Sequence, residues 1–130
     1  MIKKFKICIV QSKYNNTSGL LKSAVNELKK KKINYKILRI PGAFEIPVVI
    51  ARNINKFDGF IAIGSIIKGK TPNFDFISMA ITNALMQLSL LKKKPIGNSV
   101  ITCLNEKQAR IRSNKGYEAV IAVIEVLNAK

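Results

Sequence analysis

Short apolar runs of strand character alternate with longer amphipathic segments along this chain, and this alternation restricts its fold more than any other feature. The runs of strand character span residues 5–10, 34–40, 60–63, and 95–96 with 99–103. Between them, apolar residues recur at helical spacing, as Leu20, Ala24 and Leu28 do. Strands that alternate with helices form a parallel sheet joined by right-handed crossovers. The sequence therefore predicts an α/β fold of three layers, in which a parallel sheet of four strands, or slightly more, carries helices on both faces.

The predicted helices follow from stripes of apolar residues. They cover residues 20–28, 45–53, 77–91, 106–110 and 117–127. The residues of the long third helix that should face the core are Ile77, Ala80, Ile81, Ala84, Leu85, Leu88 and Leu91. Neither a repeat nor a low-complexity linker interrupts this order, and 130 residues is the size of one domain. We predict a single domain over residues 1–130.

Composition places the chain among globular proteins. Hydrophobic residues make up 48% of the sequence, which is enough for a core. No apolar run approaches the roughly 20 residues that span a bilayer, and Ile7–Val10 is too short for a secretory signal. Cys8 and Cys103, the two cysteines, lie in apolar runs, where a buried thiol is more common than a disulfide or a nucleophile. We expect a cytoplasmic protein.

The complete lack of histidine narrows the chemistry that the chain can perform. It excludes Ser-His and Cys-His triads, a histidine general base and metal sites that depend on histidine. Two cysteines without histidine cannot form an ordinary zinc site either. Any catalysis must therefore use other side chains or the backbone.

The charge of the chain is strongly one-sided. Twenty-three Lys and Arg residues against 7 Asp and Glu residues give a net charge of +16. Such a field could attract nucleic acid, an anionic membrane or phosphorylated small molecules. However, 19 of the 23 are lysines, which lack the bidentate geometry that reads bases. The runs 29–32 and 92–94 fall where helices should end, and lysines there complement the helix dipole. We favour a solvated surface over a specific nucleic acid or membrane partner.

The loops that follow the predicted strands form the candidate site, because parallel α/β sheets bind ligands beyond the carboxyl ends of their strands. These loops are residues 11–18, 41–45, 65–73 and the stretch after Cys103. In the second loop, the peptide groups of Ala43 and Phe44 could bind the edge of a planar ring, and Glu45 could accept hydrogen bonds from hydroxyls. The alternative is an ordinary turn in which Glu45 complements the dipole of the next helix.

Two further loops are basic and contain glycine. Residues 64–71 combine backbone N–H groups with Lys68, Lys70 and Thr71, which suits an anion such as phosphate. Their spacing is not that of a Walker loop, so a nucleoside triphosphate is not expected. Residues 112–116 could bind an anion in the same way or could simply connect two elements.

Four motifs follow one another along the chain in a distinctive order. They are Pro-Gly-Ala-Phe-Glu-Ile-Pro at 41–47, Ile-Gly-Ser-Ile-Ile-Lys-Gly-Lys-Thr-Pro-Asn-Phe-Asp at 63–75, Gln108-Ala109 followed by Arg112, and Asn114-Lys115-Gly116. Over nearly the whole chain, this set resembles the 6,7-dimethyl-8-ribityllumazine synthase family. The resemblance implies a flavodoxin-like sheet and a transferase that needs no metal or organic cofactor. It would condense 5-amino-6-(D-ribitylamino)uracil with 3,4-dihydroxy-2-butanone 4-phosphate, releasing phosphate and water, in riboflavin biosynthesis.

The resemblance assigns the pyrimidine side of the site by position. Tyr14 matches the aromatic residue that stacks on the ring, and Glu45 belongs to the segment that contacts the uracil and the ribityl chain. Two segments supply the remaining contacts, namely Ala43 with Phe44, and Ser65 with Ile66 and Ile67. These roles agree with the hydroxyl-accepting carboxylate expected from the residues themselves.

The phosphate side of the site both matches and departs from the family. Lys70 and Thr71 match the loop that holds the butanone phosphate, and Arg112 matches its guanidinium partner. The family's acid–base histidine falls at Asn73, and an aromatic residue that the family places across the base falls at Asn98. Asparagine forms hydrogen bonds but cannot exchange a proton near neutral pH. We therefore expect synthase activity that is retained but slowed; the alternative is a non-catalytic lumazine- or flavin-binding shell protein.

The resemblance also implies an assembly. Family members form pentamers that share active sites between neighbouring subunits, and some pentamers close into sixty-subunit icosahedral shells. By position, Tyr14, Glu45 and Thr71 would belong to one subunit, while Asn98 and Arg112 would reach in from its neighbour. We expect small-molecule substrates and at least a homopentamer.

Overall fold

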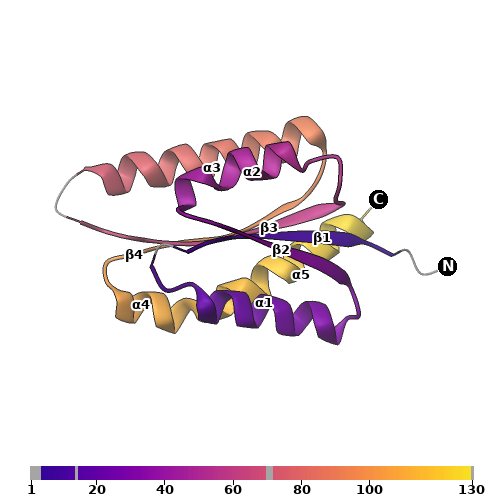
Figure 1. Cartoon of the computed structure of the whole chain (residues 1–130), viewed down its shortest axis with the longest axis horizontal. Helices are drawn as coiled ribbons and strands as arrows, with labels where there is room; N and C mark the ends of the chain where they lie inside the picture. The colour runs from indigo at the N-terminus through magenta and orange to yellow at the C-terminus, as the bar shows by residue number, and fades with distance from the viewer. Residues whose placement is uncertain (1–3, 14, 70–71, 130) are drawn as a thin grey trace.

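A four-stranded parallel sheet forms the middle layer of the molecule (Figure 1). The computed structural model describes residues 4–13, 15–69 and 72–129, so the predicted site residues Tyr14, Lys70 and Thr71 lie outside the described residues. The strands are β1 (Lys6–Ser12), β2 (Asn34–Ile40), β3 (Gly59–Ile67) and β4 (Ile96–Cys103). They pair in the order β2-β1-β3-β4, with every ladder parallel. The predicted α/β architecture is confirmed.

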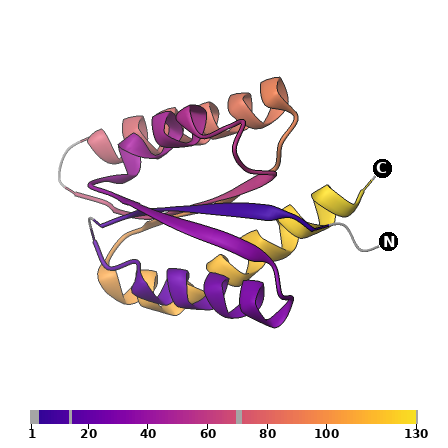
Figure 2. The same ribbon diagram turned by 45° about the vertical axis from the view of Figure 1, so that its right-hand side comes forward.

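Helices cover both faces of this sheet, as Figures 1 and 2 show. They are α1 (Ser18–Lys30), α2 (Ile46–Arg52), α3 (Asn73–Lys92), α4 (Glu106–Ile111) and α5 (Lys115–Asn128). Two short 3₁₀ turns, η1 (Ala43–Glu45) and η2 (Arg112–Asn114), precede α2 and α5. Helices α1, α4 and α5 pack on one face, and α2 and α3 pack on the other. The strands run in one direction, so their carboxyl ends and the loops after them share one end of the molecule.

The core consists of two apolar clusters, one on each face of the sheet. Side chains alternate between the faces along a strand. In β1, Ile7 and Ile9 therefore enter the cluster under α1 and α5, whereas Cys8 and Val10 enter the cluster under α2 and α3. All four are fully buried, which explains why the central strands are apolar at consecutive positions.

Both cysteines are buried free thiols. Burial raises the pKa of Cys8 from 9.0 to about 11, and the nearby charge of Lys36 opposes this shift in part. Burial also raises the pKa of Cys103, against the charge of Arg112. Since the thiolate is the reactive form of cysteine, neither thiol is suited to act as a nucleophile.

Two strands extend further than the sequence predicts. Gln11 and Ser12 belong to β1, and Ser65–Ile67 belong to β3, although both stretches were predicted to be loops. Gln11 has strand partners on both sides, Arg39 in β2 and Ile63 in β3. Residues 65–67 pair with residues 101–103 of β4. Ladder pairing on neighbouring strands therefore overrides the polar or glycine-bounded local sequence.

Helix α3 turns the predicted face toward the sheet but buries it less completely than predicted, with Ile77 and Leu88 only partly buried against the core. Only Ile81 and Leu85 are buried among its described residues, while the predicted core residues Ala80 and Leu91 are exposed, Leu91 at 75%. The large apolar side chains on its outer face are Phe76, Met79, Met86, Leu90 and Leu91. By length and composition alone this 20-residue helix could cross a membrane. A single helix of this kind is weak evidence for a membrane span. None of the residues that the structure describes covers this apolar face.

Candidate active site

The loops at the carboxyl ends of β1, β2 and β3 enclose a cavity of about 350 Å³ together with the start of α3. It is lined by Asn15, Gly42, Ala43, Phe44, Ser65, Ile66, Ile67, Gly69, Asn73, Phe74 and Ile77. Six of the predicted site residues are among them: Ala43, Phe44, Ser65, Ile66, Ile67 and Asn73. Three segments that are far apart in the sequence thus meet at one place, at the end of the sheet where ligands of parallel sheets bind.

The η1 turn shapes one wall of this cavity. The Gly42 backbone N–H donates to Glu45 Oε1 at 3.0 Å, which closes the turn on itself. The turn also packs tightly on β3, since a Cβ at Gly64 would lie 3.2 Å from the Cβ of Ala43. Glycine at this position therefore allows the close approach. Pro47 follows within the first turn of α2, where its missing N–H costs no helical hydrogen bond.

Glu45 lies beside the cavity and does not line it. Its carboxylate is half-buried and held by the Gly42 amide, as a first-turn glutamate would be in an ordinary turn. A carboxylate accepts several hydrogen bonds, so this contact leaves acceptor capacity for a ligand hydroxyl. The arrangement is thus compatible with both interpretations of the 41–45 motif.

Asn15 is a site residue that the sequence analysis did not identify. Its backbone is left-handed, with φ of 63°, and its side-chain Nδ2 donates to the Ser65 carbonyl at 2.7 Å. This bond fastens the loop after β1 to the end of β3 and forms part of the cavity wall. Asparagine is one of the few residues that readily adopt this conformation. An asparagine in the loop after β1 was therefore the one feature of the sequence that pointed to this role.

Asn73 is the first residue of α3, and its side chain is exposed at the cavity. The N-cap residue is Pro72, whose side chain makes no capping hydrogen bond, and Asn73 follows it and does not occupy the cap position. Asp75 lies in the same first turn. None of the described residues that line the cavity carries a side chain that titrates near neutral pH.

Asn98 and Arg112 lie outside the cavity of their own chain. Asn98 is exposed on the edge strand β4, where its Oδ1 accepts from the Val100 backbone N–H at 3.0 Å. Arg112 is exposed on η2, and its Nη1 donates to the Thr102 carbonyl at 2.9 Å. A single chain therefore does not bring these two residues to the described site residues that line the cavity.

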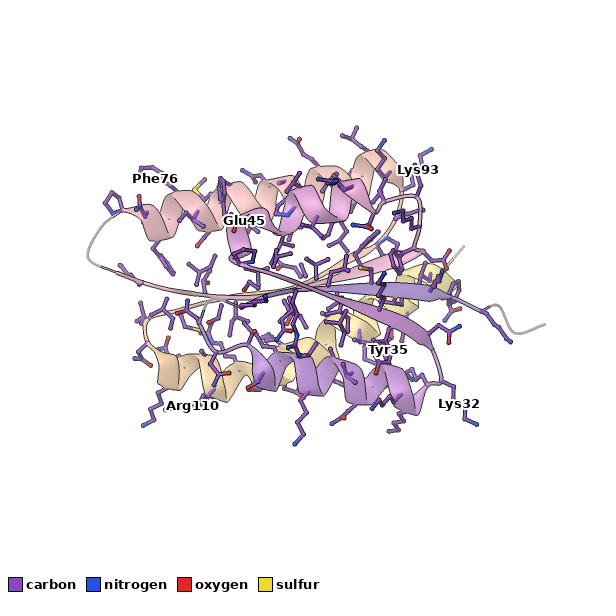
Figure 3. All side chains as sticks on the ribbon, in the orientation of Figure 1. Lys32, Tyr35, Glu45, Phe76, Lys93 and Arg110 are labelled. Atoms are coloured by element: carbon purple, nitrogen blue, oxygen red, sulfur yellow. The ribbon has the colours of Figure 1, made fainter. Side chains whose placement is uncertain are left out.

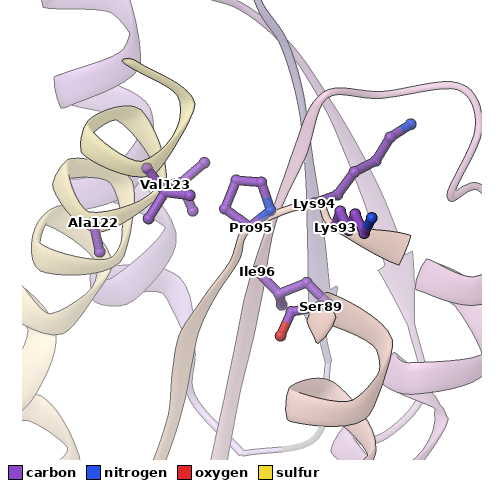
Figure 4. Close-up of a pocket in the computed structure, with 8 residues that line it drawn as sticks. Ser89, Lys93, Lys94, Pro95, Ile96, Ala122 and Val123 are labelled. Atoms are coloured by element: carbon purple, nitrogen blue, oxygen red, sulfur yellow. The ribbon is translucent and has the colours of Figure 1, made fainter. Parts of the chain in front are cut away.

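A second cavity, of about 390 Å³, lies at the opposite end of the sheet, around the start of β4 and the ends of α3 and α5 (Figure 4). Its apolar walls include Pro95, Ile96 and Val123. The side chain of Lys94 extends away from Val123 in Figure 4, and its Nζ donates to the Ile54 carbonyl at 2.7 Å. This cavity is remote from the strand ends at which a doubly wound sheet binds ligands, so we do not assign the site to it.

Comparison with known proteins identifies the family. The family model of 6,7-dimethyl-8-ribityllumazine synthase matches residues 4–130. This chain belongs to that family. A lumazine synthase of Cutibacterium acnes is 36% identical over 134 residues, which cover 95% of this chain and 81% of that protein. One of Bartonella tribocorum is 36% identical over 140 residues, which cover 100% of this chain and 93% of that protein.

A third relative gives the same result. The protein named 6,7-dimethyl-8-ribityllumazine synthase 1 of Rhodopseudomonas palustris is 34% identical over 139 residues, which cover 96% of this chain and 85% of that protein. The strand order β2-β1-β3-β4 also agrees with the flavodoxin-like order implied by the family resemblance. Family, fold and cavity position therefore agree.

Proposed function

We propose that this chain is a 6,7-dimethyl-8-ribityllumazine synthase, a transferase of riboflavin biosynthesis. It condenses 5-amino-6-(D-ribitylamino)uracil with 3,4-dihydroxy-2-butanone 4-phosphate and releases phosphate and water. Membership of the family over residues 4–130 supports this activity. The observation that carries the proposal is the convergence of Ala43 with Phe44, of Ser65–Ile67, and of Asn73 on one cavity.

The cavity offers groups that suit the pyrimidine substrate. Apolar side chains such as Ile66 and Ile77 can cover a flat ring, while the backbone of the η1 turn offers N–H and C=O groups to its edge. Glu45, at the rim, accepts hydrogen bonds from ribityl hydroxyls. The phosphate of the second substrate binds at the basic loop of residues 68–71, with Arg112 from a neighbouring subunit as its guanidinium partner.

The reaction proceeds without a histidine. The substrate amine is itself a nucleophile and the partner is a ketone, so holding both in one cavity lowers the barrier by up to about 7–11 kcal/mol. Asn73 can hydrogen-bond the reacting groups but cannot take or give a proton, and water must carry the protons instead. A positioned acid–base group is typically worth about 10²–10⁴-fold in rate, which is the factor that this chain forgoes.

The active form is at least a homopentamer, with each site shared between two subunits. Two observations support this assembly. Asn98 and Arg112 do not reach the cavity of their own chain, and α3 presents an uncovered row of apolar side chains. Phe76, exposed at 67%, projects outward near the start of α3 in Figure 3. Contiguous exposed apolar residues typically mark an interface with another protein.

Light scattering at moderate salt tests the assembly. A mass of five chains or a larger multiple, up to a sixty-subunit shell, is expected, and a monomer at working concentration would contradict the shared site.

We place the reaction in the cytoplasm, where buried free thiols such as Cys8 and Cys103 stay reduced.

The enzymatic proposal is tested by mixing the purified protein with both substrates and following lumazine absorbance. A rate above the uncatalysed background is expected, and a rate equal to it would remove the synthase assignment. The second candidate, a lumazine- or flavin-binding protein without turnover, is favoured by the asparagine at position 73. It predicts saturable binding of the lumazine together with no acceleration.

A further inference from the structure

A third cavity, of about 420 Å³, lies at the amino ends of β1 and β2, opposite the candidate active site. Three lysines from separate segments line it: Lys6 opens β1, Lys36 lies in β2, and Lys56 follows α2. Asn34 and Asn53 also line it, and the Asn53 side-chain Nδ2 donates to the Val49 carbonyl at 2.7 Å. No carboxylate is among the described residues that line this lysine pocket.

The sheet register directs two of these lysines to the same place. Lys6 pairs with Asn34, so their side chains project from the same face of the sheet. Lys36 lies two residues further along β2 and projects from that face as well. This is also the face of Cys8, whose pKa is affected by the charge of Lys36. Helix α2 ends at Arg52, and the chain that follows it carries Lys56 to the same pocket.

Hydrogen bonds fix the segment that carries Lys56 before any ligand arrives. The Asp58 backbone N–H donates to the Lys6 carbonyl at 2.8 Å, and the Lys6 N–H donates to Asp58 Oδ2 at 2.8 Å. The Lys56 N–H donates to the Asn53 carbonyl at 3.0 Å. Asp58 is the acidic residue next to the pocket, and its carboxylate is engaged by this backbone contact.

The pocket is electropositive, and within residues 4–13, 15–69 and 72–129 its lysines form no ion pair with an acid. The two salt bridges among the described residues, Lys31–Glu27 and Lys115–Glu118, lie elsewhere. Lys6 Nζ lies 5.8 Å from the centroid of the buried Phe57 ring, which places it over the apolar side of the pocket. The three positive charges around the cavity repel each other. A dianion bound between them would attract all three, so the net electrostatic interaction would become favourable.

The wider surface adds to this field. Lysine runs follow α1 and α3 at the same end of the molecule, and Figure 3 shows Lys32 and Lys93 there, away from Phe76 and Arg110. Such a surface raises the local concentration of anions. We propose that the lysine pocket binds a phosphate group, either as free phosphate or pyrophosphate or on a small phosphorylated molecule. This site is separate from the one proposed for the substrate phosphate and does not depend on the proposed function.

Calorimetric titration of the assembled protein with pyrophosphate at about 0.15 M salt tests the proposal, because nonspecific surface attraction is largely screened there. Inorganic phosphate and ribose 5-phosphate serve as parallel probes that distinguish a free anion from a phosphomonoester. Lysine acetylation with and without the probe, read by mass spectrometry, locates the site in any oligomeric state. We expect saturable binding and protection of Lys6, Lys36 and Lys56.

The variants Lys36→Met and Lys56→Met keep the alkyl stem and remove one charge each. Each should weaken pyrophosphate binding about ten-fold or more, since charge-assisted hydrogen bonds to phosphate are lost. Lys30→Met, in the last turn of α1 at the same end, is the matched control and should change affinity less than about two-fold, because it removes only a distant screened charge.

Three results would overturn the proposal. One is a loss of pyrophosphate affinity in Lys30→Met as large as the loss in the two pocket variants, which would show that the anion is attracted by the surface in general. Another is the absence of protection at the three pocket lysines in the unsubstituted protein. The last is protection of Lys30 together with the pocket lysines by duplex DNA but not by pyrophosphate, which would indicate a nucleic acid surface instead of a small-anion pocket.

Discussion

Replacing Asn73 by histidine tests whether an acid–base group at this position reaches the reacting groups of the proposed reaction. Asn73 opens α3 at the wall of the cavity and is exposed, so an imidazole can be accommodated without displacing the core. Asp75, in the same turn, offers a carboxylate that can orient the ring. Because Asn73 does not cap the helix, no cap is lost, and the free energy of unfolding should change by no more than about 0.5 kcal/mol.

The expected gain in kcat is roughly ten-fold. A well-placed acid–base group supplies about 10²–10⁴-fold, and the gain here should fall below that range because Asn98 also departs from the family pattern. KM should move less, since asparagine already offers a hydrogen bond. The variant should also acquire a pH dependence that the parent lacks. If the neutral imidazole is the base, kcat rises as the pH passes through about 6.5.

Steady-state kinetics and thermal melting of the same two proteins provide the measurement. Asn55→His, an exposed substitution in the turn after α2 that lies outside both the cavity and the apolar row of α3, is the control and should leave kcat unchanged. If Asn73→His gives an unchanged or lower kcat with a normal melting temperature, a base at position 73 does not reach the reacting groups and the reasoning is refuted.

Three further predictions concern the fold and the cavity. Gly116→Ala places a Cβ against the backbone of α1, so it should cost about 2–3 kcal/mol in urea unfolding. Gly69→Ala, with no atom of the described residues within 4 Å of its Cβ, is the neutral control, and equal costs would contradict the packing argument. Between pH 9.0 and about 11 the unfolded Cys8 thiol ionises while the folded thiol, with its raised pKa, stays protonated, so the free energy of unfolding falls as pH rises. Cys8→Ala should show a shallower fall than the parent, and an equal slope would show that this thiol does not contribute. Asn15→Gly keeps the left-handed backbone but removes the bond to the Ser65 carbonyl, so KM for the pyrimidine should rise several-fold with little change in kcat. An unchanged KM would mean that this bond does not shape the binding wall.

The local sequence determined the order and type of the elements. Consecutive buried positions such as Ile7–Val10 predict a strand covered on both faces, and the stripe of Leu20, Ala24 and Leu28 predicts the buried face of α1. The loops after the strands could also be identified as the site, because parallel strands place their carboxyl ends together. Helical and strand periodicities depend on neighbours within a few residues, which the sequence displays directly.

Contacts between distant residues were decided only by the tertiary structure. Ser65–Ile67 become strand because they pair with the end of β4, and Asn15 enters the site through its bond to the Ser65 carbonyl. Leu91 fits the helical stripe but is exposed, because none of the described elements covers that side of α3. Arg112 follows the motif order yet bonds the Thr102 carbonyl, away from the cavity. Such outcomes depend on which surfaces meet after folding, and a periodic pattern carries no information about the partner that it will face.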